Sequence, residues 1–330
     1  MLTRISTDYV VTNRAGVIEN RHAVHAAIVD ANGQALYAIG DPSRLTLARS
    51  AAKTAQALAV LEFGAFERFD LDGADLALVC VLYSSEERHA PRTRRILSNI
   101  QYSESDLQYG GYLSTSHSVN RAWIKADFTP SPVYSNCSGK HAGILATTKA
   151  FGAVIQSYHL PTSPIQERIK DTVDELCQLP KGVEAGDSAL DSRKYALGWF
   201  LNATSSYPDL VGGEDRYCTI LMRAFPGLLI GKLGVDGCYG IGVKSSICAD
   251  GFSGPSAVGI AVKIEDGGIP MLYAAVTEIL FRLRIREPEV RKQLAAFHRL
   301  SIKNTVGVVT GGTAHMFKLR KIEVEDVAWS

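Results

Sequence analysis

The sequence has no excess of charge of either sign. Its 330 residues include 35 basic and 34 acidic side chains, which leaves a formal net charge of +1. Proteins that bind nucleic acids or anionic membranes generally carry a clustered basic excess, and no long basic run occurs here. The sequence therefore predicts no nucleic-acid partner and no membrane partner.

Long apolar runs are also missing. No stretch approaches the roughly 18 uninterrupted apolar residues of a membrane span, and the opening Met1–Arg4 lacks the apolar core of a secretion signal. We therefore expect a cytoplasmic protein. Apolar residues nevertheless make up 46% of the chain, which suffices for a large buried core in one domain or in two packed lobes.

Paired cysteine motifs are absent as well. In a long chain without a secretion signal, dispersed cysteines are expected to be reduced thiols, most of them small core residues. One or two remain candidates for metal ligands. The six cysteines are Cys80, Cys137, Cys177, Cys218, Cys238 and Cys248.

Strand patterns occur near both ends of the chain. Helical patterns fill the middle of the chain and also separate some of the C-terminal strands. Expected strands cover residues 9–11, 23–29, 36–39, 228–233, 239–243, 257–264, 306–309 and 315–319. Expected helices cover residues 88–97, 136–151, 165–176, 216–225, 271–283 and 288–297. This order predicts an α+β fold, in which both sequence ends form one antiparallel sheet with a helical insertion.

The segment Ser50-Ala51-Ala52-Lys53 carries the first chemical signal. A serine three positions before a lysine, at the start of an apolar helical run, places hydroxyl and amine on one helix face. A helix N-terminus favours negative charge, and a desolvated, neutral Lys53 can take the proton of Ser50. The alternative is an N-capping serine followed by a solvated lysine, which a lone S-x-x-K usually represents.

Three longer motifs together resemble one enzyme family. They are Leu47–Lys53, Asn136–His141 and Val262–Gly267, and shorter matches occur at 119–125, 158–161, 223–225 and 311–312. On these motifs the chain resembles the L-asparaginase II family, the rhizobial-type asparaginases. The resemblance implies a fold of the serine β-lactamase and penicillin-binding-protein type. It also implies one asparaginase-like domain, with a sheet lobe at about 1–45 and 228–330 and a helical lobe at about 46–227.

The resemblance implies a pocket with two serine–lysine pairs that attack the side-chain amide of a small substrate. At the matching positions, Ser50 and Lys53 would form the first pair, and Lys263 would supply the lysine of the second. The alternative for Lys263 is a surface lysine paired with Glu265.

The resemblance also implies a zinc ion held by two cysteines and one lysine. Cys137 and Lys140 match two of these three ligands. Three further side chains are candidates for substrate contacts, namely Arg49, Ser84 and His141. Helix capping is an alternative role for Ser84, and a bond within its own helix is an alternative role for His141.

The chain departs from the family pattern in two segments. Where the family has Ser-His-Ser after an apolar strand, this chain has Leu82-Tyr83-Ser84, so the second nucleophilic serine is replaced by Leu82. Where the family has Asp-Gly-Cys, this chain has Ser188-Ala189-Leu190, so a substrate-facing aspartate and the third zinc ligand are missing. We expect Cys238 to be a core residue and not a substitute ligand.

These losses affect the expected metal content. Zinc in proteins is normally held by three or four protein ligands, and two ligands alone hold it weakly. We therefore expect zinc to be absent or substoichiometric in protein purified without added metal, and we expect no cofactor to be required.

Three functions remain open at this stage. The first is an asparaginase-like hydrolase that uses Ser50 and Lys53 on a small amide or acyl substrate, with reduced or lost L-asparagine hydrolysis. The second is the same pocket remodelled for a biosynthetic cyclisation or isomerisation, because Leu82, Tyr83 and Leu190 would make it more apolar. The third is a non-catalytic family member that binds a ligand. In all three, the expected partner is a small molecule. A homodimer is a possible oligomeric state.

Overall fold

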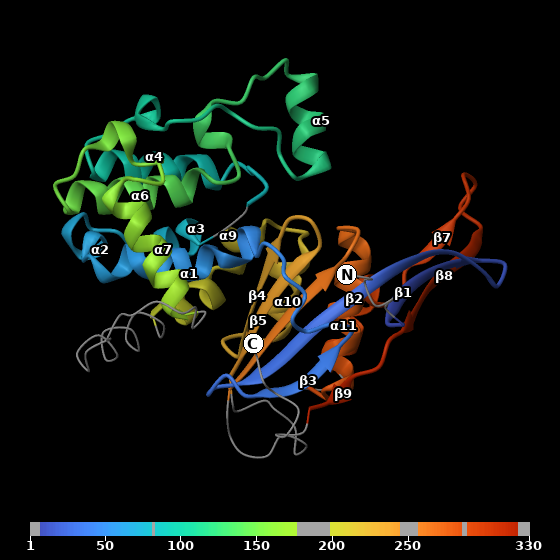
Figure 1. Ribbon diagram of the computed structural model, residues 1–330. Helices are drawn as coiled ribbons and strands as arrows, with labels where there is room; N and C mark the ends of the chain where they lie inside the picture. The colour runs from blue at the N-terminus through green and yellow to red at the C-terminus, as the bar shows by residue number, and fades with distance from the viewer. Residues whose placement is uncertain (1–6, 81–82, 177–198, 245–256, 286–288, 323–330) are drawn as a thin grey trace. The chain divides into compact units, whose positions relative to one another are not determined.

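The computed structural model describes residues 7–80, 83–176, 199–244, 257–285 and 289–322 (Figure 1). The chain divides into two compact units. Met1–Ala51 and Ile220–Ser330 form the first, which we call the sheet unit, and Ala52–Thr219 forms the second, which we call the helical unit. In the described ranges, no helix combines the length and the hydropathy that crossing a membrane requires.

The sheet unit is built on one sheet, in which every described pairing is antiparallel. The strand order is β4-β5-β6-β2-β1-β8-β7, and β3 pairs with both β2 and β9. The N-terminal strands β2 and β1 therefore lie between the C-terminal strands β6 and β8, and the predicted α+β architecture is confirmed. The strands are β1 (Tyr9–Arg14), β2 (Val17–Asp30), β3 (Ala35–Ile39), β4 (Leu229–Gly234), β5 (Cys238–Val243), β6 (Val258–Ile264), β7 (Ser301–Lys303), β8 (Val309–Met316) and β9 (Arg320–Lys321).

One face of the sheet is covered by a helix. α11 (Ile269–Arg282) contacts β1, β5 and β6, and α12 (Glu289–His298) packs on α11. Along β2 the buried residues alternate as Val24, Ala26 and Ile28, which is the period of two that a half-buried strand requires. α10 (Tyr217–Ala224) precedes β4.

The C-terminal part of the sheet differs from the sequence-based expectation. The two strands predicted over 306–309 and 315–319 are wrong, since one strand, β8, covers Val309–Met316. The side chain of Asn304 accepts hydrogen bonds from the amides of Val306 and Val308, and Gly307 adopts a φ of +83°. These contacts fold residues 304–308 into a turn that joins β7 to β8.

The helical unit is assembled around α6 (Ser138–Ala150), which contacts α1, α2, α3, α4 and α7 and the 3-10 turns η3 and η4. Two glycines let it approach α3 closely, because a Cβ atom at Gly139 would lie 2.5 Å from the carbonyl oxygen of Leu78, and one at Gly143 would lie 2.7 Å from Val79. Residues 199–206 are also helical. The other helices and turns are α1 (Lys53–Glu62), α2 (Ala65–Arg68), α3 (Gly73–Val79), α4 (His89–Asn99), α5 (His117–Lys125), α7 (Pro164–Leu176), α9 (Pro208–Gly212), η2 (Glu104–Asp106), η3 (Pro132–Tyr134) and η4 (Ile155–Ser157).

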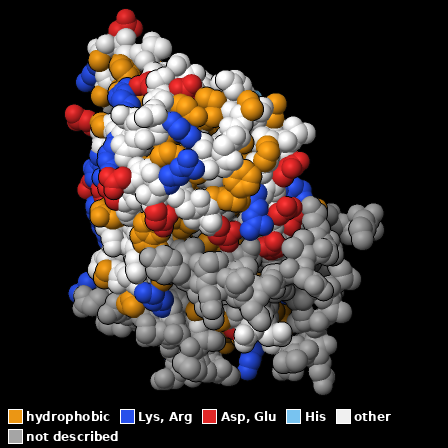
Figure 2. All heavy atoms as spheres, turned by 90° about the vertical axis from the view of Figure 1, so that its left-hand side faces the viewer, with side chains coloured by type: hydrophobic (Ala, Val, Ile, Leu, Met, Phe, Trp, Pro, Cys, Tyr) orange, Lys and Arg blue, Asp and Glu red, His pale blue; other side chains and the backbone are white. Residues whose placement is uncertain are grey.

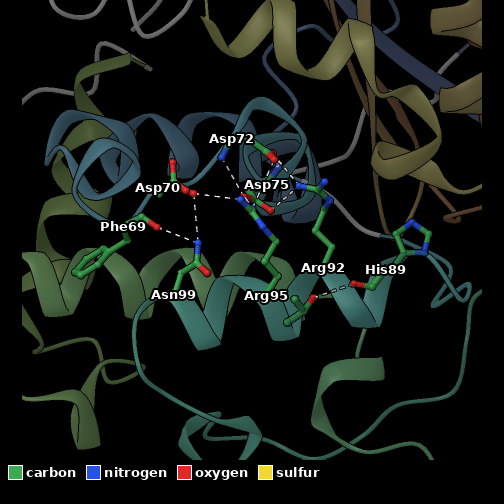
Figure 3. A network of polar contacts seen from close by, with 9 residues as sticks. Phe69, Asp70, Asp72, Asp75, His89, Arg92, Arg95 and Asn99 are labelled. Atoms are coloured by element: carbon green, nitrogen blue, oxygen red, sulfur yellow. Dashed lines mark hydrogen bonds and ion pairs between the residues drawn. The ribbon is translucent and has the colours of Figure 1, made fainter.

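An ionic network around the buried Asp75 joins α3 to α4 (Figure 3). Asp72 and Asp75 form a reciprocal capping box at the start of α3. Arg92 donates to both carboxylates at 2.7 Å, and Arg95 also bonds to Asp75, whose side chain is fully buried. Asn99 donates to the backbone oxygen of Phe69. The network fixes the two helices on either side of the segment that carries Tyr83 and Ser84.

Two further expectations are corrected in this region. The apolar strand of the family pattern corresponds here to residues 76–79, which are helical in α3, because the capping box at Asp72 starts a helix there. Ser84 does not cap the next helix, since α4 begins at His89 and Arg88 occupies its N-cap position. The helices predicted over 88–97, 136–151 and 165–176 are confirmed as α4, α6 and α7.

On the described part of the face shown in Figure 2, basic and acidic side chains are interspersed among apolar ones. Much of the charge on α4 and α7 is paired. Arg94 donates to Glu104 at 2.6 Å, and Lys170 donates to Asp174 at 2.6 Å. Paired surface charges of this kind favour solubility and add little to stability.

Candidate functional site

Lys53 and Cys137 meet inside the helical unit. Lys53 is the first residue of α1 and is only 4% exposed, and its Nζ atom lies 3.1 Å from the Sγ atom of Cys137. Cys137 occupies the N-cap position of α6, and its Sγ atom lies 3.2 Å from Oδ1 of Asn136. Lysine is almost never buried without a partner, so this contact is a candidate centre of chemistry.

Burial controls the protonation of the two lysines at this centre. Burial lowers the pKa of Lys53, the nearby Lys140 lowers it further, and the sulfur of Cys137 opposes the shift. Burial likewise lowers the pKa of Lys140, which lies in the first turn of α6, with Cys137 again opposing. A buried amine with a lowered pKa is neutral more often than a solvated one, so it can accept a proton.

His141 lies one residue after Lys140 and packs among aromatic side chains. Nδ1 of His141 lies 3.1 Å from the hydroxyl of Tyr158, and the ring of Tyr109 packs against His141 at 4.5 Å between centroids. Burial, together with Lys140 and Lys53, lowers the pKa of His141 to about 3, so its imidazole is neutral at pH 7. His141 therefore contacts residues outside its own helix, and the alternative of a bond within the helix does not describe its position.

Tyr83 fills the interior beside the start of α6. Its ring is fully buried and stacks on His89 at 4.4 Å, and its hydroxyl bonds to Ser138 and lies 3.1 Å from the carbonyl oxygen of Val133. Burial raises the pKa of Tyr83 to about 12. Tyr83 therefore serves as a neutral structural residue at this position.

Ser50, Arg49 and Lys263 belong to the sheet unit. Ser50 is half-buried in η1 (Arg49–Ala52), which runs directly into α1. Arg49 is exposed and lies 3.4 Å from the carboxylate of Asp236. Lys263 on β6 donates to the carbonyl oxygens of Asp236 and Ile264, at 2.5 and 2.6 Å. The structure thus brings Arg49 and Lys263 to the same turn, between β4 and β5.

The hydrogen bond between Ser50 and Lys53 stays a prediction, because the two residues fall in different units. The expected partner of Lys263 is occupied elsewhere. Glu265 accepts a hydrogen bond from Arg44 at 2.8 Å and lies 3.5 Å from His25.

Ser84 lies at a cleft in the helical unit. It is buried, and its hydroxyl donates to Glu86 at 2.7 Å. Arg88, in the same wall, pairs with Asp209 at 2.7 Å and with Glu214. The side chains that line this cleft do not include the predicted site residues Lys53, Cys137, Lys140 and His141. The cleft measures about 730 Å³ and is lined by Ser84, Glu86, Glu87, Arg88, Ser116, His117, Ser118, Glu214, Asp215 and Arg216.

The described residues do not fit a zinc ion at Cys137. Its sulfur is engaged by Lys53, and within the described ranges no group of three His, Cys, Asp or Glu side chains surrounds it. A thiol and the amine of Lys140 fall short of the three protein ligands that zinc normally requires. Cys238, considered as a substitute, is buried with its Sγ atom 3.3 Å from the carbonyl oxygen of Leu47, so its prediction as a core residue is confirmed. The two replaced positions, Leu82 and Leu190, lie outside the described residues.

Sequence reasoning missed two features. The carboxylates and guanidinium groups of the cleft have no local motif, because they come from the segment just before α4 and from residues more than 120 positions later. Glu278, His298 and His315 converge in the sheet unit, although 20 and 17 residues separate them. The only signal of this cluster in the sequence is the spacing of its Glu and His residues, and that spacing matches no common metal-binding motif.

Comparison with known protein families identifies one match. The family model described as L-asparaginase II matches residues 10–191 and 182–315, which together cover most of the chain. A search of curated proteins found no match.

Proposed function

The chain belongs to the L-asparaginase II family, and we propose that it uses Ser50 and Lys53 to attack a small amide, with reduced or lost hydrolysis of L-asparagine. Membership supports an asparaginase-like amidohydrolase at the family level. The observation that carries the finer proposal is the burial of Lys53, which lowers the pKa of its amine and so favours the neutral form that a base requires.

The proposed reaction follows the chemistry of a serine–lysine pair. The amine of Lys53 takes the proton of the Ser50 hydroxyl while Oγ bonds to the carbonyl carbon of the amide. The amide C–N bond then breaks, and the proton leaves on ammonia. Water hydrolyses the resulting ester and restores the serine hydroxyl. Lys53 is suited to this because burial holds its pKa below that of a solvated lysine.

The proposed low rate of L-asparagine hydrolysis follows from the residues near Ser50 and Lys53 in the family pattern. The polar groups of the segment after Leu82 are directed to structural partners, since Tyr83 bonds to Ser138 and Ser84 donates to Glu86. The second serine and the substrate-facing aspartate are also replaced in the sequence. Groups that act as a unit lose most of their effect when one is removed, and each 1.36 kcal/mol is about tenfold in rate.

Ammonia release from L-asparagine by the purified protein tests the proposal, with Ser50→Ala as the matched variant. We expect slow release that Ser50→Ala abolishes while the far-UV circular dichroism stays unchanged. A fast, Ser50-dependent rate would contradict the reduced activity and leave the nucleophile in place.

A panel of other small amides and acyl esters separates the remaining outcomes. Turnover of one of them, lost in Ser50→Ala and in Lys53→Met, would support the same pair acting on a different substrate. A rate that survives Ser50→Ala would remove Ser50 from the mechanism. No turnover of any compound by the folded wild-type protein would favour the remodelled or non-catalytic alternatives.

A further inference from the structure

Three potential metal ligands converge in the sheet unit. Glu278 lies on α11, His298 ends α12, and His315 lies on β8. One ligand atom from each lies within 4.8 Å of the others. All three side chains are shielded from solvent, with side-chain exposures of 16%, 17% and 3%.

Both imidazoles face the same carboxylate oxygen. Nε2 of His298 lies 2.6 Å from Oε2 of Glu278, and Nδ1 of His315 lies 3.7 Å from the same atom. The two rings are nearly parallel, with centroids 4.9 Å apart. The other carboxylate oxygen, Oε1, accepts a hydrogen bond from Nε of Arg282 at 2.7 Å. Arg282 thereby fixes the carboxylate and leaves Oε2 directed at the two histidines.

Glu278 and His315 have the protonation states that metal ligands require. Burial alone would raise the pKa of Glu278, but the bonds from His298 and Arg282 outweigh it and hold the pKa at about 2. Burial lowers the pKa of His315 to about 4 against the opposing effect of Glu278. At pH 7, therefore, Glu278 is a carboxylate and His315 is a neutral imidazole, the forms that bind metals.

The cluster also leaves a buried polar atom unsatisfied. Nε2 of His315 has no hydrogen-bond partner among the described residues. Nδ1 is the nitrogen of His315 that faces Glu278, so Nε2 is the second ring nitrogen, which in a metal-bound histidine donates to a carboxylate, a carbonyl oxygen or water.

We propose that Glu278, His298 and His315 form a binding site for a divalent transition-metal ion such as Zn²⁺. Two imidazoles and one carboxylate are a ligand set that zinc uses, with water in the fourth position. The ion enters between Oε2 of Glu278 and Nε2 of His298, and any proton shared by these two atoms is released to solvent. Because the ligands come from α11, α12 and β8, the ion ties β8 to these two helices.

The test uses the whole protein, stripped of metal with a chelator and then titrated with Zn²⁺ and, separately, with Co²⁺. We expect one Zn²⁺ per chain, a rise in melting temperature, and visible Co²⁺ absorption of a four-coordinate site. His298→Gln should raise the zinc dissociation constant at least about tenfold. His22→Gln is the matched control, because His22 in the same unit pairs with Asp266 at 2.6 Å without a second histidine.

Cys137→Ala distinguishes this site from the family zinc position, and we expect it to bind Zn²⁺ as the wild type does. The variant His298→Cys covers the case in which His298→Gln fails to fold, since a thiolate ligand adds a sulfur-to-cobalt charge-transfer band. That band would support the site even if its hydrogen bonds are lost. No saturable zinc binding by the wild type, or binding that Cys137→Ala abolishes, would overturn the proposal, as would unchanged binding by folded His298→Gln.

Discussion

The Nζ atom of Lys53 contacts the Sγ atom of Cys137 across 3.1 Å, although 84 residues separate them in the sequence. The contact joins the start of α1 to the start of α6. It also places the amine where water cannot solvate it, which is costly for a charged lysine. A residue kept in such a position at the expense of stability is typical of a functional site.

Lys53→Met should therefore stabilise the protein while abolishing any amide hydrolysis. Methionine has nearly the same length, and it removes the cost of burying an amine, so we expect a gain of about 1 kcal/mol. The melting temperature by circular dichroism measures it. Lys125→Met, on the exposed end of α5, is the control and should change stability little. A clear loss of stability in Lys53→Met would show that the contact with Cys137 is structural.

Acid should weaken the protein through His89. Burial lowers the pKa of this fully buried histidine from 6.5 to about 4, and Glu86 opposes the shift only in part. The unfolded chain therefore binds a proton near pH 6.5 that the folded chain refuses. The stability is fully present above pH 6.5 and is lost as pH falls toward 4, by up to roughly 3 kcal/mol.

His89→Phe tests this pH dependence, because phenylalanine keeps the ring that stacks on Tyr83 and cannot be protonated. Urea unfolding at pH 7 and pH 4.5 should show a smaller difference in this variant than in the wild type. His117→Phe, at an exposed position, should keep the wild-type difference. An equal pH dependence in His89→Phe and wild type would mean that other groups control acid sensitivity.

The ionic network between α3 and α4 should be sensitive to Asp75. Its side chain is fully buried and pairs with Arg92 and Arg95, so Asp75→Ala leaves two guanidinium groups without their buried partner. We expect a loss of about 3–5 kcal/mol. Asp72→Ala removes a half-exposed partner and one helix cap, which should cost about 1 kcal/mol. Urea unfolding compares the two, and equal losses would contradict the importance of burial.

The close approach of α6 to α3 should make Gly139 intolerant of a side chain. A Cβ atom there would lie 2.5 Å from a backbone oxygen, so Gly139→Ala must shift one helix and should cost about 1–3 kcal/mol. Gly110→Ala is the control, because nothing lies within 4 Å of its Cβ position. Thermal unfolding of both variants measures the difference, and a neutral Gly139→Ala would show that the two helices separate easily.

Restoring the replaced family residues should recover function in stages. Leu82→Ser alone should recover little asparagine hydrolysis, because the lost groups act as a unit. Leu82→Ser combined with Leu190→Cys should bind one zinc ion per chain more than the wild type before activity returns, since a third ligand completes the family site. Both positions lie outside the described residues, so elemental analysis and ammonia release are the measurements. Full activity from Leu82→Ser alone would contradict this order.

Local sequence determined the elements whose patterns are complete within a few residues. The strands β5 and β6 and the helices α6 and α7 were predicted almost at their observed positions, because their periodicity and turns are local. The family motifs around Ser50 and Asn136 were also readable from the sequence, and they identify the family.

Where a local pattern fits both a helix and a strand, tertiary contacts determined which of the two formed. The run from Leu76 is apolar throughout, and such a run fits a buried strand or a buried helix equally well. Residues 76–79 of this run are helical because Asp72 and Asp75 cap α3 and α6 packs along it through Gly139 and Gly143.

Only the tertiary structure decided which distant polar groups meet. Lys53 reaches Cys137, Arg49 and Lys263 share the turn at Asp236, and Glu278 collects two histidines from other elements. The sequence lists these residues but carries no signal for their distances, because each contact follows from helix and strand packing over long separations. Burial then sets their pKa values, and burial is a property of the folded chain alone.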